Sequence, residues 1–212
     1  MADSDLALRV FVNAIAEGKS ADALQMLAVS PDLAKASFRS GATRQAATEN
    51  FLGPVGRYLV SGDTALHIAA AAYRKELVRE LIRAGADIHA RNRFGDEPLH
   101  AAAVGNPSSH RWNPAAQAAT IVCLIEAGAD PNTADKRGVT PLHKAVRTRC
   151  ALAVRALLEH GADPLRKNKS GSTAMVLATH NTGRGGTGSP QAKEQQREIV
   201  RLLEERSAAT LG

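Results

Sequence analysis

The feature that most constrains the fold is a six-residue string that recurs along the chain at a fixed period. Its copies read Thr-Ala-Leu-His-Ile-Ala, Glu-Pro-Leu-His-Ala-Ala, Thr-Pro-Leu-His-Lys-Ala and Thr-Ala-Met-Val-Leu-Ala, and they begin at residues 64, 97, 140 and 173. A second string, Gly-Ala-Asp, begins at residues 85, 128 and 161. Both strings keep a period of 33 residues except for one shared interval of 43 residues, so one unit carries a ten-residue insertion. Such self-similarity predicts a stack of small repeated units.

Each repeated unit is expected to contain two helices. The threonine that opens most copies can cap the free N–H groups of a first helix, and proline in the first turn costs no hydrogen bond. A second segment such as Leu77 to Ile82 places its apolar residues on one side of a helix. The glycine of each Gly-Ala-Asp string can then end that second helix in the left-handed conformation. Because one unit buries its apolar sides only against its neighbours, no unit is expected to fold alone.

The repeated strings resemble the ankyrin repeat, which has 33 residues and the signature Thr-Pro-Leu-His-x-Ala. The resemblance implies an all-α fold, an α-solenoid of about five helix-turn-helix units with short β-hairpin-like finger loops. It also implies binding of another protein through the concave face and the finger loops. The layout and the Arg/Ala-rich composition look like those of stand-alone bacterial ankyrin-repeat proteins.

The spacing of the strings divides the chain into units. We expect residues 1–61 to hold a degenerate N-terminal capping repeat followed by a long connection, in which residues 43–52 look helical before Gly53 and Pro54. Ankyrin repeats then occupy 62–94, 95–137 with an insertion between its helices, 138–170, and 171–206 with a Gly-rich insertion and a C-terminal cap. Residues 207–212 are expected to form a tail.

The two insertions offer a candidate pocket. Both fall between the two helices of their unit, so both should emerge on the same edge of the solenoid, on either side of a turn in which Arg149 replaces the usual glycine. The residues that could line a shallow pocket there are His110, Trp112, Arg149 and Arg184. The alternative is that both insertions are surface loops without a ligand, because long loops are tolerated at little cost.

Charge suggests the character of the partner. Nine basic and two acidic residues fall between Lys136 and Lys169, an excess that accounts for the net charge of +6 of the whole chain. The expected interaction residues lie at finger tips and on one concave helix face: Arg91, Arg93, Phe94, Lys136, Arg137, Lys144, Arg147, Lys167 and Lys169. A basic strip of this kind predicts a partner protein with an acidic surface. A basic surface that only keeps the protein dissolved is the alternative.

No catalytic motif emerges from the sequence, and we expect neither an enzyme nor a cofactor. His67, His100 and His143 share one register and should bond backbone groups within their own repeats. The remaining histidines have no partner at a metal-ligand spacing. The string Gly183-x-Gly185-x-x-Gly188 matches a dinucleotide-binding fingerprint in its letters, but it follows an expected helix instead of a strand.

The cytoplasm is the expected location, because no stretch of 18 apolar residues occurs and the first residues do not resemble a secretion signal. We expect a monomer whose two cysteines are small buried residues. Two functions compete with protein binding. Nucleic-acid binding by the basic strip is disfavoured by an aromatic content of 3% and by the lack of a nucleic-acid-binding motif. Binding of an anionic small ligand in the pocket between the insertions is the other alternative.

Overall fold

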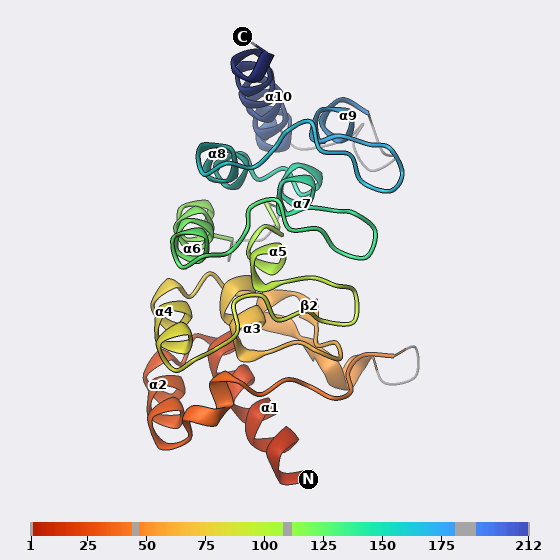
Figure 1. The fold of residues 1–212 in the computed structure, drawn as a ribbon. Helices are drawn as coiled ribbons and strands as arrows, with labels where there is room; N and C mark the ends of the chain where they lie inside the picture. The colour runs from red at the N-terminus through yellow and green to blue at the C-terminus, as the bar shows by residue number, and fades with distance from the viewer. Residues whose placement is uncertain (1, 44–46, 108–111, 181–189, 212) are drawn as a thin grey trace.

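The computed structural model describes residues 2–43, 47–107, 112–180 and 190–211 of the chain. In these residues the helices form successive antiparallel pairs stacked in one row, with the two termini at opposite ends (Figure 1). The first helices of the pairs are α1 (Ala2–Glu17), α3 (Ala65–Ala71), α5 (Pro98–Ala102), α7 (Pro141–Arg147) and α9 (Ala174–Thr179). The second helices are α2 (Ser20–Val29), α4 (Lys75–Arg83), α6 (Pro114–Glu126), α8 (Ala151–Glu159) and α10 (Pro190–Leu211). The stack is the all-α solenoid expected from the repeats.

The core runs without interruption along the stack. Each first helix packs against the first helix of the next pair, as α1 does on α3 and α3 on α5, and the second helices form a parallel layer. The third residue of the first three repeated strings is a leucine that is fully buried between these layers, as Leu66, Leu99 and Leu142 show. Alanines such as Ala102 are also fully buried, because a small side chain lets neighbouring helices approach closely. The pairs therefore depend on each other for burial.

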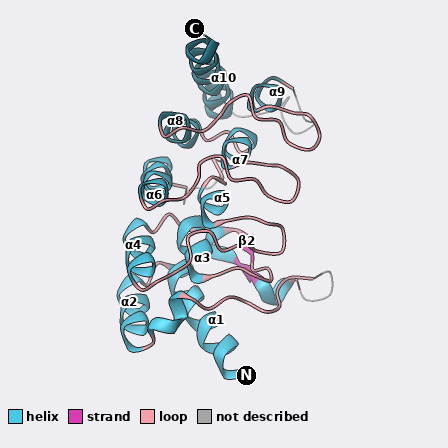
Figure 2. Cartoon of the chain, in the orientation of Figure 1, coloured by secondary structure: helices cyan, strands magenta, loops and turns pink. Residues whose placement is uncertain are grey.

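The first helices begin where the repeated strings place them. Thr64, Thr140 and Thr173 each accept a hydrogen bond from a backbone N–H in the first turn of the helix that follows. Pro98 and Pro141 occupy the first position of α5 and α7. Finger loops follow the second helices, and Figure 2 shows that they project from the same side of the stack. The helix starts predicted from the capping residues are confirmed.

The long connection after the first pair differs from expectation. The predicted helix over residues 43–52 is wrong in the part that the structure describes, where Thr48–Asn50 forms one 3-10 turn (η2) and a small hairpin follows. The hairpin pairs β1 (Phe51–Leu52) with β2 (Arg57–Tyr58) in antiparallel register around the 3-10 turn η3 (Gly53–Val55). Hairpin pairing places the Phe51 and Tyr58 rings in a tilted contact, with 4.9 Å between centroids and 50° between planes, and leaves Leu52 buried. Packing against the stack thus overrides local helix propensity.

Buried polar contacts fix this hairpin to the stack. Arg57 donates through Nη2 to both carboxylate oxygens of Asp63, at 3.0 and 3.1 Å. Asp63 is fully buried, and it also accepts hydrogen bonds from the Val60 N–H and from the Asn92 amide. From the other side, Arg9 on α1 donates to the Glu49 carbonyl and to the Asn50 side chain. The hairpin is therefore held by both the first and the second helix pair.

At the C-terminal end, α10 continues to Leu211. Residues 207–211, expected as a tail, therefore extend the last helix. Ile199 and Leu203 of α10 pack into the core, while Arg201 on its outer side pairs with Glu198 and Glu205. A polar outer side suits the end of a stack, because nothing covers it. No helix among the described residues is long and apolar enough to cross a membrane.

Candidate functional site

The finger loops are rigid because a polar side chain closes each turn and the backbones of neighbouring fingers are bonded together. Asp135 accepts from the N–H groups of Arg137 and Val139, at 2.7 and 2.8 Å, and Asn92 and Asn168 close the fingers before and after it in the same way. Three backbone hydrogen bonds link successive fingers: Arg93 N–H to Ser61 O, Lys136 N–H to Phe94 O, and Lys169 N–H to Arg137 O. The finger tips are thus held in a fixed row.

Glycine is required where these fingers touch. Gly138 has φ +73°, a left-handed conformation that favours glycine, and a Cβ atom there would lie 3.0 Å from the Lys169 nitrogen. Gly95 has φ +82° and meets the Lys136 nitrogen in the same way. The close approach of the fingers therefore depends on the absence of a side chain at both positions.

The three histidines of the repeated strings connect each helix start to the next unit. Nδ1 of His67, His100 and His143 accepts from the backbone N–H three residues earlier, at 3.1–3.2 Å. Because an N–H can only donate, the ring proton sits on Nε2, which donates to a carbonyl in the next finger loop at 3.0 Å. Burial lowers the pKa of all three rings. The hydrogen bond of each histidine ring within its own repeat was predicted, whereas its second hydrogen bond, to the neighbouring unit, was not.

Exposed cations gather at the last two fingers. Arg137, Arg166, Lys167 and Lys169, here called the fingertip strip, are exposed, and none of their side chains forms an ion pair within the described residues. The Lys169–Arg137 backbone bond of 2.9 Å places two of these cations on adjacent tips. Arg166 was left out of the expected interaction residues, although the run Arg-Lys-Asn-Lys that contains it could have identified it. Arg147 is exposed at the end of α7.

Several expected interaction residues are instead engaged within the protein. Lys144, an expected interaction residue, forms an ion pair with Asp96 at 2.6 Å, with both side chains mostly buried, so its ammonium is engaged within the protein. Although burial acts to raise the pKa of Asp96, the Lys144 ammonium outweighs it and the pKa lies below its usual value. Arg91 pairs with the buried Glu97 carboxylate at 2.8 Å. These contacts connect finger loops to neighbouring units.

The finger before them is also internally bonded. Arg93 lies over the Phe94 ring, 4.7 Å from its centroid, and donates to the Ala42 carbonyl at 2.7 Å. Lys136 donates from Nζ to the Arg93 carbonyl at 2.7 Å. Phe94 keeps 40% of its surface exposed. Arg93 and Lys136 therefore hold neighbouring loops together in addition to their place in the expected basic surface.

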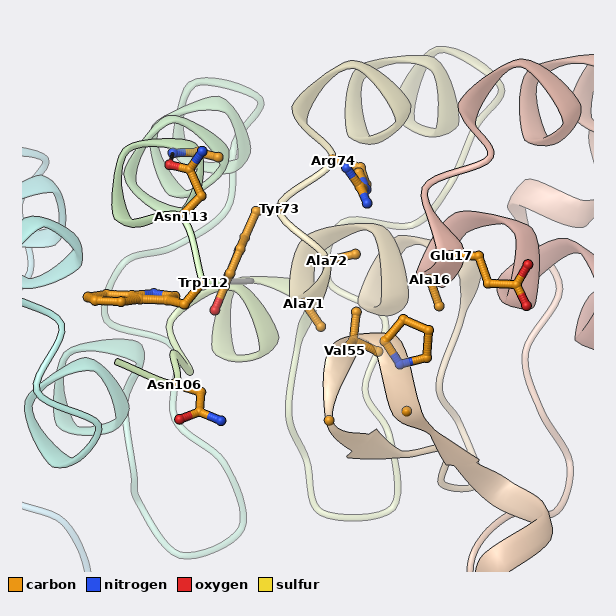
Figure 3. A pocket seen from close by; sticks show the side chains of 14 residues that line it. Ala16, Glu17, Val55, Ala71, Ala72, Tyr73, Arg74, Asn106, Trp112 and Asn113 are labelled. Carbon is orange, nitrogen blue, oxygen red and sulfur yellow. Dashed lines mark hydrogen bonds between the residues drawn. The ribbon is translucent and has the colours of Figure 1, made fainter. Parts of the chain in front are cut away.

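A cavity of about 890 Å³ opens on the edge of the stack where the first helices turn into the second helices. Its walls come from four segments: the α1–α2 turn, the 3-10 turn η3, the α3–α4 turn, and both ends of the α5–α6 insertion. In Figure 3, Trp112 and Tyr73 lie at one end, Ala16 and Glu17 lie at the other, and Arg74 and Val55 face each other between them. Trp112 was an expected pocket residue. Arg149 does not line this cavity, and His110 and Arg184 lie outside the described residues.

Hydrogen bonds fix the aromatic end of the cavity. Trp112 donates from Nε1 to Gln117 at 2.8 Å, and Gln117 donates in turn to the Ala102 carbonyl at 2.9 Å. The Tyr73 hydroxyl donates to the Val104 carbonyl at 2.6 Å, and burial raises the pKa of this phenol. Tyr73 also has φ 56°, an uncommon conformation for a residue with a side chain. Sequence reasoning indicated Trp112 but missed Tyr73, which comes from an earlier repeat than expected.

In the part of the chain that the structure describes, no group of three potential ligand side chains is arranged to hold a metal ion. Cys123 and Cys150 are both free and buried, and burial raises the pKa of Cys150.

Comparisons with known proteins agree with the repeat geometry. A family model described as Ankyrin repeat matches residues 61–93, and a model described as Ankyrin repeats (many copies) matches residues 124–178. A comparison with curated proteins found no match. Ankyrin repeats generally act as non-enzymatic modules that bind other proteins. Residues 61–93 and 124–178 are therefore ankyrin repeats, and the paired helices and finger loops of the described residues follow the same arrangement.

Proposed function

We propose that the chain binds a partner protein with an acidic surface through the fingertip strip and the adjoining concave face. The observation that supports this is the position of Arg137 and Lys169 on adjacent fingers, tied by a backbone hydrogen bond of 2.9 Å. Both side chains are exposed and form no ion pair in the described part of the chain. Two like charges held close together repel each other, and an opposite charge on a partner relieves that repulsion.

Rigid fingers favour such binding. The hydrogen bonds of Asp135 and Asn168 fix the two turns before a partner arrives, so little backbone entropy is lost on association. Long-range attraction between the basic strip and an acidic surface raises the association rate, and this effect falls with added salt. Leu165, which keeps 46% of its surface exposed beside Arg166, supplies an apolar contact on the same finger.

The test uses two doubly substituted variants that change the net charge equally. Arg137→Glu with Lys169→Glu reverses the strip, whereas Arg79→Glu with Lys193→Glu reverses exposed cations on the second-helix side of the stack. Each chain is immobilised, incubated with native cell extract and cross-linked, and bound proteins are identified by mass spectrometry. We expect acidic proteins captured by the wild type and by the control variant to be lost with the strip variant.

Equal capture of those proteins by all three chains would contradict the proposal. Nuclease treatment of the extract separates protein binding from the competing function. Capture that disappears after nuclease treatment, together with affinity for duplex or single-stranded DNA that falls steeply with salt, would favour nucleic-acid binding instead.

A further inference from the structure

The cavity at the helix-turn edge is built by the two places where the first half of the chain departs from the 33-residue period. One wall is η3, at the tip of the hairpin in the long connection, and another is formed by Asn106, Trp112 and Asn113 of the α5–α6 insertion. Residues 71–74 of the regular α3–α4 turn lie between them. Regular repeats alone would leave this edge without either wall. The long connection and the α5–α6 insertion thus both contribute to one partly open cavity, remote in sequence from the fingertip strip.

Arg74 is the cation of this cavity. Its Nε atom is buried and has no hydrogen-bond partner, and no described residue pairs with its guanidinium. The guanidinium lies directly over Gly18, where a Cβ atom would come within 2.4 Å of Nη2. Gly18 also has φ +81°, so this position requires glycine for both its backbone and its neighbour. An unpaired, partly buried guanidinium is a costly group that an anionic ligand would satisfy.

The charges around the cavity favour a ligand that carries one negative charge. The N-terminus of α4 begins beside Arg74 without a side-chain cap, but Glu76 in its first turn opposes the positive potential of the N–H groups, so the positive charge here is that of Arg74 itself. Glu17 is the other charged residue of the lining, and Lys19 neutralises it through an ion pair of 2.7 Å. One net positive charge fits a carboxylate better than a doubly charged phosphate.

Apart from Asn106 and Asn113, the rest of the lining is apolar or aromatic. Trp112, Val55, Ala71 and Ala72 provide surface for an uncharged group next to the anion. The cavity volume of about 890 Å³ lies within the range of small-molecule and peptide pockets. Tyr73 is held in its left-handed conformation at this wall, and strained residues tend to gather at binding sites.

We propose that this cavity is a second binding site, separate from the fingertip strip, which takes a carboxylate that is next to an apolar group. Arg74 binds the carboxylate with its guanidinium, and the apolar group lies against Trp112 and Val55. A free small acid or chain terminus and an acidic side chain within a peptide share this chemistry.

The first experiment compares two matched probes on the full chain. N-acetyl-leucine carries the carboxylate and N-acetyl-leucinamide lacks it, and neither absorbs where tryptophan does. Trp112 is the only tryptophan of the chain, so its fluorescence reports directly on the cavity. We expect N-acetyl-leucine to bind with a dissociation constant on the order of 1 mM and the amide at least about tenfold more weakly. Equal binding of both probes, or no response to either, would overturn the proposal.

Two variants with opposite expected effects on binding distinguish a change of charge in the cavity from simple misfolding. Arg74→Gln removes the cation and should weaken N-acetyl-leucine binding about tenfold or more, while leaving the weak binding of the amide unchanged. Glu17→Gln removes a negative charge from an exposed position and should strengthen the binding of N-acetyl-leucine. Arg79→Gln, on the exposed side of the same helix α4, is the matched control and should bind as the wild type does. Unchanged binding in both cavity variants would exclude Arg74 as the recognition group.

A third probe identifies the source of the carboxylate. The blocked peptide acetyl-Ala-Leu-Glu-Leu-Ala-amide carries only an internal carboxylate. Tighter binding of this peptide than of N-acetyl-leucine supports an acidic peptide segment, whereas the reverse order supports a free acid or a chain terminus. Failure of both probes overturns the site without affecting the capture experiment on Arg137 and Lys169.

Discussion

Lys144 on α7 and Asp96 in the preceding finger form an ion pair with 2.6 Å between Nζ and Oδ1, although 48 residues separate them. Their side chains retain only 17% and 16% of their exposure. The pair joins the first helix of one unit to the finger of the unit before it. Lys144 is therefore a contact between repeats, in addition to its place on the concave side.

Replacing Lys144 with methionine should lower the free energy of unfolding by about 1–3 kcal/mol, because the partly buried Asp96 carboxylate loses its counter-charge. Urea denaturation followed by circular dichroism measures the change. Asn at position 96 should recover part of the loss, so the double variant Lys144→Met with Asp96→Asn should be more stable than the sum of the single effects predicts.

The exposed pair of Arg83 and Glu80, also 2.6 Å long, is the control for that measurement. Arg83→Met should change stability little, because an exposed ion pair in water contributes little. A Lys144→Met variant as stable as Arg83→Met would mean that the 96–144 contact does not hold the units together.

Acid should destabilise the stack through its three buried histidines. Burial lowers the pKa of His67, His100 and His143 in the folded chain, so the unfolded chain binds more protons just below pH 6.5. The stabilisation is therefore complete above pH 6.5 and is lost as the pH falls toward the folded-state pKa values. Each ring contributes up to about 1.4 kcal/mol per pH unit in that window.

Urea titrations at pH 7.5 and pH 5.5 test this histidine effect. The lowered pKa values of Asp96 and Glu198 act at more acidic pH, so they contribute little to that comparison. His100→Gln should be less stable than the wild type at pH 7.5 but should lose less stability between the two pH values. If the wild type were equally stable at pH 7.5 and pH 5.5, protonation of the buried rings would not lower the free energy of unfolding.

Periodicity made the regular part of the fold predictable. The string beginning at Thr64 fixes a cap, a helix and a buried leucine within a few residues, and the string beginning at Thr140 repeats these local relations. The fingertip cations were predictable for the same reason, because a loop position follows from the register. What the strings could not indicate is a contact such as Lys144 with Asp96, which depends on how one unit lies over the next.

The segments that break the period were predicted least well. Residues 47–52 include helix-favouring Ala and Glu, yet they lead into a hairpin because Arg57 and Asp63 pair across the connection. The position of the insertion that carries Trp112 was predictable, but its neighbours were not. Its cavity is closed by η3, and no repeated pattern indicates where that turn packs.

Replacing Arg149 with glycine should raise the free energy of unfolding. It has φ 57° in the α7–α8 turn, where a left-handed conformation costs a residue with a Cβ atom about 1–2 kcal/mol. Glycine removes that strain but gains freedom in the unfolded chain, which costs about 0.4–1 kcal/mol. Arg149→Gly should therefore stabilise the protein by about 0.5–1 kcal/mol in urea denaturation. Arg147→Gly, two residues earlier within α7, should destabilise it by a similar amount, and a loss in both variants would contradict the strain at Arg149.

Gly105 should tolerate no side chain, because it lies against the groups that hold Trp112. A Cβ atom there would come within 2.3 Å of the Cys150 sulfur and 2.9 Å of the Trp112 Nε1 atom. Gly105→Ala should cost about 1–3 kcal/mol through overpacking, and displacement of the indole should shift its fluorescence to longer wavelength. Gly53→Ala is the control, because a Cβ atom at Gly53 in the opposite wall meets nothing within 4 Å. Fluorescence that is unchanged in Gly105→Ala would mean that the indole is free to move away from Gln117, and that this end of the cavity is not fixed before a ligand binds.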